Sequence, residues 1–288
     1  MGITLDSSNF RIDRTIDNAS THIERDTYIV TDNKGQKHEI EVDRFICDPK
    51  KLNLADINAM RSLGRNMTGS LADPNGLTSD ELLQTNGFSD CLVATGGIYF
   101  ASAKKQWLDG TQTRQGDGLV WYKPDPNREG RLLSENIGNF ASGGFLLVNQ
   151  EGNGSVQREA QWNEQQNDYN GYRMIVQSNV ILVHNGQEDQ NGNFDRAART
   201  ALSIQKNGQL SVVVVHEKNK SKNGYGLTQR EFGDLLVALG SKEAINLDGG
   251  PSAQFAFKDP NCSAESSGCV EQWVSNPDDI PQLFTVSK

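Results

Sequence analysis

The residues with the clearest chemical content lie in 242–255, KEAINLDGGPSAQF. A short apolar run there predicts a buried strand, which ends in Asp248 followed by Gly249 and Gly250. A carboxylate at a strand end can serve as a base, a hydrogen-bond acceptor or a metal ligand, and glycine amides beside it can form an anion-binding concavity. The alternative is a tight turn in which Asp248 caps its own loop.

A cation that could complement this carboxylate lies upstream, where Arg199 and Thr200 begin an apolar strand. Arginine binds phosphate through two parallel hydrogen bonds, so an arginine at a strand end is compatible with an anion site. An isolated arginine in this position is otherwise an ordinary surface charge. The strand continues into a predicted hairpin whose turn is Asn207-Gly208.

Two histidines also end apolar strands, His184 in 180–184 and His216 in 210–216. Both could approach the site as acid–base groups, because imidazole changes its charge near neutral pH. The alternative is that each is an edge histidine whose ring is hydrogen-bonded to the backbone.

The elements that must position these residues are mostly strands. The best helix signal is 227–240, where Thr228 and Glu231 form a capping box and apolar residues recur at helical spacing. Residues 27–42 predict a β-hairpin around a Gly-containing turn. Further strand candidates are 91–95, 118–122, 144–148, 172–177, 180–184, 200–204, 210–216, 244–248 and 254–257. We therefore predict an α+β fold, with a large mixed β-sheet core and few helices.

The composition limits the possible partners and cofactors. The 288 residues carry a net charge of −9 without a dense Lys/Arg cluster, which argues against a nucleic-acid partner. No apolar run approaches the length of a membrane span. None of the four cysteines forms a C-x-x-C pair, which disfavours a zinc site. Cys262 and Cys269 could form a disulfide in an oxidising compartment, or remain thiols in a reducing one.

Five short motifs occur in an order that resembles the phosphodiester glycosidase family. They are TGGIYF (95–100), LVHNG (182–186), RTALSI (199–204), GLTQREF (226–232) and NLDGGPSAQ (246–254). The resemblance covers roughly residues 90–258, and it implies the fold of that family. Two positions depart from the family pattern: Thr95 stands where the family usually has Asn, and Pro251 replaces a third Gly.

The resemblance implies hydrolysis of the bond between a sugar anomeric carbon and a phosphodiester oxygen. For this reaction we assign Arg199 to the phosphate and Asp248 to the anomeric side, as a base or by stabilising an oxocarbenium-like centre, as the catalytic residues. Their neighbours would bind the phosphate or the sugar hydroxyls: Thr95, Gly96, Gly97, His184, Thr200, Asn246, Gly249, Gly250 and Ser252. Trp107, Trp121 and Tyr122 either stack on a sugar face or belong to the core and its rim. The expected partner is a glycan, such as an exopolysaccharide, that carries a sugar-1-phosphodiester.

Two other functions stay open. One is a non-catalytic carbohydrate- or phosphoglycan-binding protein on the same fold. The other is a metal-dependent hydrolase, for which the alternating side chains of 188–195 suggest a Ca²⁺ loop: Asp189, Asn191, Asn193 and Asp195. This loop fails the EF-hand pattern, so we expect no cofactor, with Ca²⁺ as the alternative.

The sequence suggests two parts, a strand-rich N-terminal extension in 1–75 and the catalytic domain in 76–288, or one continuous domain. The first 75 residues could cover the site, pair with another chain or extend the sheet. The first residues, MGITLDSSNFRIDR, lack the basic and apolar layout of a signal peptide. The resemblance nevertheless favours a secreted or periplasmic location.

Overall fold

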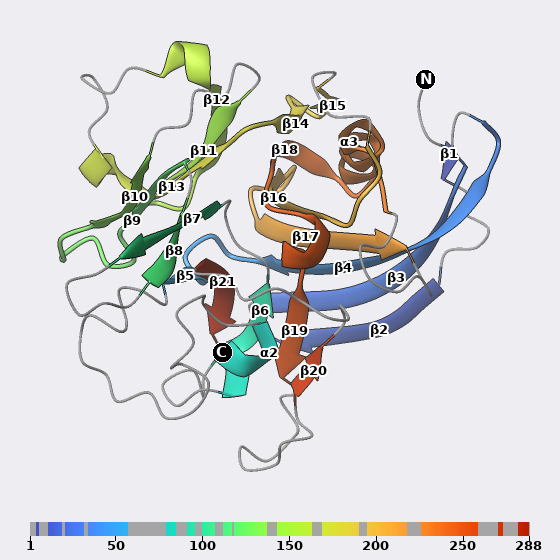
Figure 1. Cartoon of the computed structure of the whole chain (residues 1–288), viewed down its shortest axis with the longest axis horizontal. Helices are drawn as coiled ribbons and strands as arrows, with labels where there is room; N and C mark the ends of the chain where they lie inside the picture. The colour runs from blue at the N-terminus through green and yellow to red at the C-terminus, as the bar shows by residue number, and fades with distance from the viewer. Residues whose placement is uncertain are drawn as a thin grey trace.

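A computed structural model of the chain describes residues 4–5, 11–18, 21–31, 34–56, 79–84, 91–95, 100–106, 112–116, 118–136, 143–162, 169–189, 195–217, 226–258, 270–272 and 282–287. Strands dominate these residues, and the helices among them are few and short (Figure 1). The predicted strand-rich α+β class is confirmed. Among the described residues, no helix is both long and apolar enough to cross a membrane.

The largest sheet has nine strands, in the order β1-β3-β4-β17-β16-β18-β14-β15, with β2 also paired to β3. The strands are β1 (Thr4–Leu5), β2 (Arg11–Asn18), β3 (Thr21–Thr31), β4 (Lys37–Cys47), β14 (Ile181–His184), β15 (Gln187–Glu188), β16 (Arg199–Gln205), β17 (Leu210–Glu217) and β18 (Ser241–Asn246). The predicted mixed sheet is antiparallel in every described pair. Short hairpins join antiparallel neighbours, whereas parallel pairs need long crossover connections.

Two five-stranded sheets pack beside the largest one (Figure 1). The first has the order β10-β9-β13-β11-β12 and contains β9 (Gly118–Tyr122), β10 (Arg131–Asn136), β11 (Gly144–Asn149), β12 (Gly154–Arg158) and β13 (Tyr172–Ser178). The second has the order β20-β19-β6-β21-β5 and contains β5 (Leu52–Asp56), β6 (Cys91–Thr95), β19 (Phe255–Lys258), β20 (Val270–Gln272) and β21 (Gln282–Ser287). A separate pair joins β7 (Phe100–Gln106) and β8 (Gln112–Gly116).

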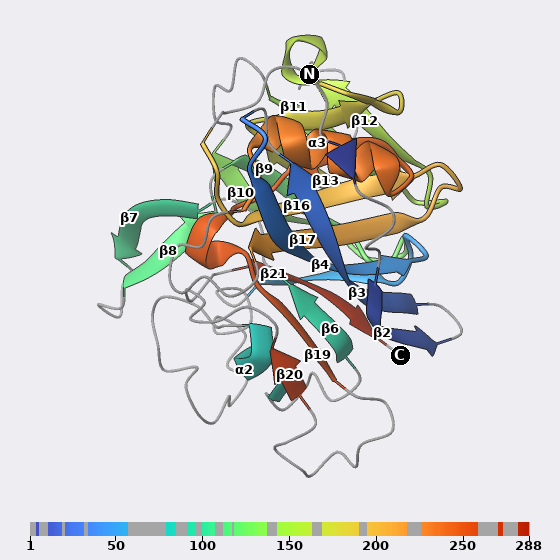
Figure 2. The same ribbon diagram turned by 90° about the vertical axis from the view of Figure 1, so that its right-hand side faces the viewer.

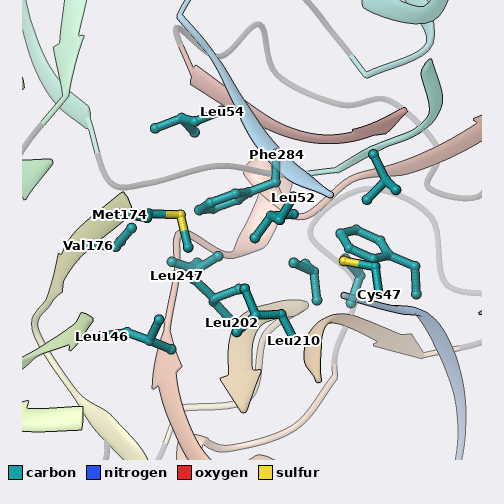
Figure 3. Packing of buried hydrophobic residues seen from close by; sticks show 14 of the residues in the cluster. Cys47, Leu52, Leu54, Leu146, Met174, Val176, Leu202, Leu210, Leu247 and Phe284 are labelled. Carbon is teal, nitrogen blue, oxygen red and sulfur yellow. The ribbon is translucent and has the colours of Figure 1, made fainter. Parts of the chain in front are cut away.

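The main hydrophobic core lies where the three sheets meet. Figure 3 shows Leu202 of β16 and Leu247, which directly follows β18, near Met174 of the first five-stranded sheet and Phe284 of the second. All four are buried. The alternation of side chains along a strand explains the arrangement, because one face of β16 and β18 points toward this core and the other face does not.

The other face of β16, β17 and β18 is covered by helix α3 (Gln229–Ala238) (Figure 2). The predicted capping box is present: the Glu231 amide donates to the Thr228 hydroxyl at 3.2 Å, and the Glu231 carboxylate accepts from the Thr228 amide at 2.9 Å. Gly240 follows the helix with a φ of 90°, as expected for a glycine that ends a helix. The prediction for 227–240 is therefore confirmed to within two residues at each end. The other helices in the described ranges are α2 (Ser79–Gln84) and the 3-10 turns η3 (Glu159–Gln161), η4 (Tyr169–Gly171) and η5 (Gly250–Ser252).

The N-terminal strands share sheets with the rest of the chain. The predicted hairpin is β3 and β4, and β4 pairs with β17 from Leu210 to Glu217. Strand β5 pairs with β21 near the C-terminus. Cys47, at the end of β4, is fully buried, and burial raises the pKa of its thiol to about 12. Residues 21–56 therefore contribute to the same sheets and core as the residues that follow them.

Candidate active site

The pairing of β16 with β18 places Arg199 beside Asp248. The register pairs Ala201 with Asn246, and it continues past the end of β18, where the Leu247 amide donates to the Thr200 carbonyl at 2.8 Å. Extended by two residues, this antiparallel register sets Arg199 opposite Asp248, about 5 Å apart at the Cα atoms. The two residues singled out from sequence thus lie at the same end of neighbouring strands.

Close packing of glycine holds the loop after Asp248 against β16. A Cβ atom on Gly249 would lie 2.6 Å from the Ala198 carbonyl oxygen and 3.7 Å from the Arg199 Cα atom. The Gly250 amide donates to the same Ala198 oxygen at 2.8 Å, and Gly250 has a φ of 60°. The two glycines therefore have different roles: Gly249 allows the close approach, and Gly250 supplies a left-handed turn.

The amides of this loop already have acceptors inside the protein. The Gly249 amide donates to Asp248 Oδ1 at 2.9 Å, and Ser252 and Ala253 donate to the Gly249 and Gly250 carbonyls in the turn η5. Pro251 is the second residue of that turn, at an early position where a missing N–H leaves no bond of the turn unmade. The amide cradle expected from sequence at Gly249 and Gly250 is thus engaged in holding the loop.

Arg199 is buried and donates to two main-chain carbonyls. Its Nε atom donates to Leu227 at 3.1 Å, and Nη2 donates to Asp195. These two bonds fix the orientation of the guanidinium. Arg199 thus links Asp195, which precedes β16, with Leu227, which precedes α3.

The segment before α3 is joined to the segment before β16 by a short antiparallel bridge. Ala197 and Leu227 exchange two main-chain hydrogen bonds of 3.3 and 3.1 Å. Arg196 adds a bond of 3.0 Å to the Gly226 carbonyl and an ion pair with Glu231. Sequence reasoning did not single out Arg196, although its spacing of three residues from Arg199 was a visible signal.

Asn246 is hydrogen-bonded to the end of β13 and to the turn that follows it. The Asn246 amide donates to the Val180 carbonyl at 2.9 Å, and the Ser178 hydroxyl at the end of β13 donates to the Asn246 carbonyl. The Asn246 side chain is 2% exposed and donates to the Leu247 carbonyl at 2.8 Å. Asn246 therefore positions the chain before Asp248. Sequence reasoning missed Ser178, which has no motif.

Thr200 and Ser252 are buried. Thr200 follows Arg199 and therefore points to the opposite face of β16, where Leu202 belongs to the main core. The Thr200 hydroxyl has no hydrogen-bond partner within the described part of the chain.

His184 lies at the opposite end of β18. Its Nδ1 atom is 2.9 Å from Glu243 Oε2, and Glu243 also accepts from the Asn185 amide at 3.2 Å. Because β14 runs antiparallel to β18, the last residue of β14 lies beside the first residues of β18. Glu243 and Asp248 are separated by roughly 16 Å along an extended chain. The structure thus does not bring His184 together with Asp248.

His216 lies at the same end of the sheet as Arg199 but faces the other way. Val215 is opposite Arg199 in the register, so the next residue points to the other face. The His216 Nε2 atom is 3.5 Å from Glu41 and 3.4 Å from Asp43, both on β4. His216 therefore belongs to an ion-pair group between β17 and the N-terminal hairpin.

Two ends of the proposed Ca²⁺ loop are described, and Asn191 and Asn193 lie outside the described residues. Asp189 Oδ2 accepts from Arg158 Nη2 at 2.6 Å, and the Asp195 carbonyl accepts from Arg199. Among the described residues, no group of three or more His, Cys, Asp or Glu side chains could hold a metal ion. Burial raises the pKa of the neighbouring Glu188, with smaller contributions in the same direction from Asp234 and Asp189.

The TGG motif is described only at its first residue. Thr95 ends β6 and pairs with Phe255, which follows the 248–252 loop by three residues. The backbone of the first motif thus lies beside the strand that leaves the last motif. Gly96 and Gly97 lie outside the described residues, as do Trp107, Cys262 and Cys269. Trp121 stacks on Tyr169 at 5.6 Å, and Tyr122 donates to Asn53 at 2.7 Å, so both pack within the protein.

Comparison with known proteins assigns the chain to a family. A family model described as phosphodiester glycosidase matches residues 91–281. The chain belongs to the phosphodiester glycosidase family. The matched range contains Arg199 and Asp248, and it begins at β6, so the strands β1–β5 lie outside it. A comparison with curated proteins finds no match.

Two solved structures share the fold. The catalytic domain of zebrafish N-acetylglucosamine-1-phosphodiester alpha-N-acetylglucosaminidase, described as auto-inhibited by its pro-peptide, has a TM-score of 0.65 and 15% sequence identity, over 97% of this chain and 87% of that chain. A hypothetical protein from Synechocystis has a TM-score of 0.52 and 13% identity, over 99% of this chain and 68% of that chain. Since the first match covers nearly the whole chain, the fold similarity extends to the N-terminal strands that the family model leaves out.

Proposed function

We propose that this phosphodiester glycosidase hydrolyses the bond between the anomeric carbon of a sugar and the oxygen of a phosphodiester. The observation that carries the proposal is the register of β16 and β18, which sets Arg199 opposite Asp248. A cation and a carboxylate on neighbouring strand ends match the two parts of such a substrate, the phosphate and the anomeric carbon. Family membership and the structural likeness support the reaction class.

Arg199 is the proposed phosphate ligand. Two main-chain carbonyls, those of Leu227 and Asp195, fix its guanidinium. Arginine is the side chain that binds phosphate oxygens best through parallel hydrogen bonds. A donor fixed before the reaction needs no reorganisation when charge develops on the leaving oxygen. This assignment replaces the expected amide cradle of Gly249 and Gly250, because both amides already donate within the protein.

Asp248 is the proposed base. Water would add to the anomeric carbon as its bond to the phosphodiester oxygen breaks, and the bonding electron pair would leave with that oxygen as a phosphate monoester. Asp248 would take the proton of the attacking water or stabilise the positive charge that develops on the sugar ring. A phosphate monoester leaves more readily than an alcohol, so the arginine can take the place of a second carboxyl group.

The first test is Asp248→Asn assayed on methyl esters of hexose and N-acetylhexosamine 1-phosphates in both anomers. We expect kcat to fall by roughly 10²–10⁴, the usual contribution of a general base. Asp125→Asn is the matched control, because Asp125 also accepts an amide of its own turn, from Asn127 at 2.9 Å. If the two variants had similar rates, Asp248 would be only a turn-capping residue.

The same assay separates the other two functions. A non-catalytic phosphoglycan-binding protein would bind the methyl phosphodiester without releasing free sugar. A metal-dependent hydrolase would lose activity with EDTA and regain it with Ca²⁺. The proposed hydrolase releases free sugar and methyl phosphate, and EDTA leaves its rate unchanged.

A further inference from the structure

We propose that Arg196 is a positioning residue of this site, which fixes the phosphate-binding orientation of Arg199 through the Gly226–Leu227 segment. The inference rests on the proposed function, because it assigns Arg199 to the phosphate. Arg196 lies outside the RTA and GLT motifs that carried the resemblance to the family. It acts through other residues and does not touch the substrate.

Arg196 joins two elements on either side of the site. Its Nη1 atom donates to the Gly226 carbonyl at 3.0 Å, and its Nη2 atom forms an ion pair with Glu231 Oε1. The second oxygen of Glu231 accepts from the amide and hydroxyl of Thr228, at 2.9 and 3.1 Å. One arginine therefore connects the segment before β16 with the carboxylate that caps α3.

The segment held in this way supplies an acceptor to Arg199. The Leu227 carbonyl accepts from Arg199 Nε at 3.1 Å and from the Ala197 amide at 3.3 Å. Gly226 allows the close contact, since a Cβ atom there would lie 2.2 Å from the Ala197 carbonyl oxygen. A shift of Gly226 and Leu227 would thus rotate the Arg199 guanidinium.

Arg196 has a buried charged partner within the protein. Arg196 faces a carboxylate, and both side chains of that pair are largely buried, with 16% and 14% exposed. Its charge is therefore compensated inside the protein. Arg199 donates to the main-chain carbonyls of Leu227 and Asp195. The buried ion pair with Glu231 suits Arg196 for holding the chain, which is the positioning role proposed for it.

The test compares Arg196→Gln with Arg158→Gln. Arg158 also pairs with a carboxylate, Asp189, at 2.6 Å, but it connects β12 with the end of β15 and not with Leu227. For Arg196→Gln we expect kcat/KM on a methyl sugar-1-phosphodiester to fall roughly 10- to 100-fold, as for small misplacements of a catalytic group. The same variant should raise the inhibition constant of inorganic phosphate and leave the inhibition constant of the free sugar unchanged. Arg158→Gln should change none of the three.

A purely structural role of Arg196 would lower the active fraction and leave both inhibition constants unchanged, and this result would overturn the inference. Glu231→Gln provides a second variant if Arg196→Gln fails to fold, because the Gln oxygen can keep the helix cap while the charged acceptor for Arg196 is removed. Glu231→Gln should raise the inhibition constant of inorganic phosphate by a smaller factor than Arg196→Gln does. An unchanged phosphate constant in Glu231→Gln would also contradict the inference.

Amide hydrogen exchange separates this inference from the proposed function. Exchange at residues 227–232 should be faster in Arg196→Gln than in the wild type, and unchanged in Arg158→Gln. If the wild type cleaves no sugar-1-phosphodiester, the proposed function fails, and equal exchange in wild type and Arg196→Gln would then overturn the positioning role as well. If the wild type is active and Arg196→Gln matches it in rate and exchange, only the inference fails.

Discussion

Strand β18 has a carboxylate near each end, and the two ends differ in how those carboxylates are held. Glu243 is 5% exposed, and its two oxygens bind the His184 ring and the Asn185 amide. Asp248 is half-buried, receives the amide of its own turn, and lies opposite Arg199. One end of the strand thus has a buried carboxylate whose two oxygens bind side-chain and main-chain groups, and the other has a more accessible carboxylate beside a cation.

The two ends of β18 contrast a structural carboxylate with the proposed catalytic one. A buried carboxylate that is paired on both oxygens stabilises its surroundings, and breaking the pair leaves a charge without a partner. A half-exposed carboxylate next to an arginine can exchange its partner for a substrate. A mutation of Asp248 should therefore lower the activity with little effect on stability, and a mutation of Glu243 should lower the stability with little effect on activity.

The largest expected effect is on Arg199. Arg199→Gln should lower kcat/KM on the sugar-1-phosphodiester by roughly 10²–10³, as for the loss of a fixed donor to a developing charge. Arg173 is the matched control, because it is also buried and donates to main-chain carbonyls, those of Lys50 at 2.8 Å and Pro124. Arg173→Gln should reduce the melting temperature and leave kcat/KM per folded molecule unchanged. Equal loss of activity in both variants would make Arg199 a structural residue.

The next effect comes from the contact of the loop with β16. Gly249→Ala places a methyl group against the Ala198 carbonyl oxygen, so the loop with Asp248 must move. We expect kcat to fall roughly tenfold or more from this displacement. Gly208→Ala also replaces a glycine, at a hairpin turn with a φ of 87° and open space around it. It should cost about 1–2 kcal/mol of stability without changing kcat. Wild-type kcat in Gly249→Ala would show that the position of Asp248 is unimportant.

The smallest effect on catalysis is expected at Glu243. Glu243→Gln removes the charge that binds His184 and should lower the free energy of unfolding by about 1–3 kcal/mol, with kcat unchanged. Asp248→Asn should change the free energy of unfolding by less than about 1 kcal/mol, because its amide oxygen can still accept from Gly249. Urea unfolding gives the free energy of unfolding of both variants, and the kinetic assay gives their kcat values. A stability loss at Asp248 as large as that at Glu243 would remove the distinction between the two ends.

Much of the fold was predictable from short apolar runs. Strands β6 and β9 match their predicted ranges at both ends, and α3 follows its capping box and helical spacing. Several of the missed strands are polar, for example β12, whose side chains are all partly or fully exposed, and β2 with its sequence RIDRTIDN. Polar edge strands are defined by their neighbours more than by their own pattern, so no periodicity reveals them.

The site was predictable in part. Arg199 and Asp248 were singled out by their residue types and by the family resemblance, but their adjacency depends on the pairing of β16 with β18, which is distant in sequence. His184 was expected near them because it ends an apolar strand. The antiparallel direction of β14 places that end at Glu243 instead. Strand direction, which the sequence does not encode locally, thus decides which strand ends share a site.

The most direct measurement is a crystal structure of the protein soaked with a sugar 1-phosphate. The account predicts phosphate oxygens within hydrogen-bonding distance of the Arg199 guanidinium and the anomeric carbon directed toward Asp248. A sugar phosphate bound beside His184 and Glu243, or with its phosphate away from Arg199, would contradict the central claim.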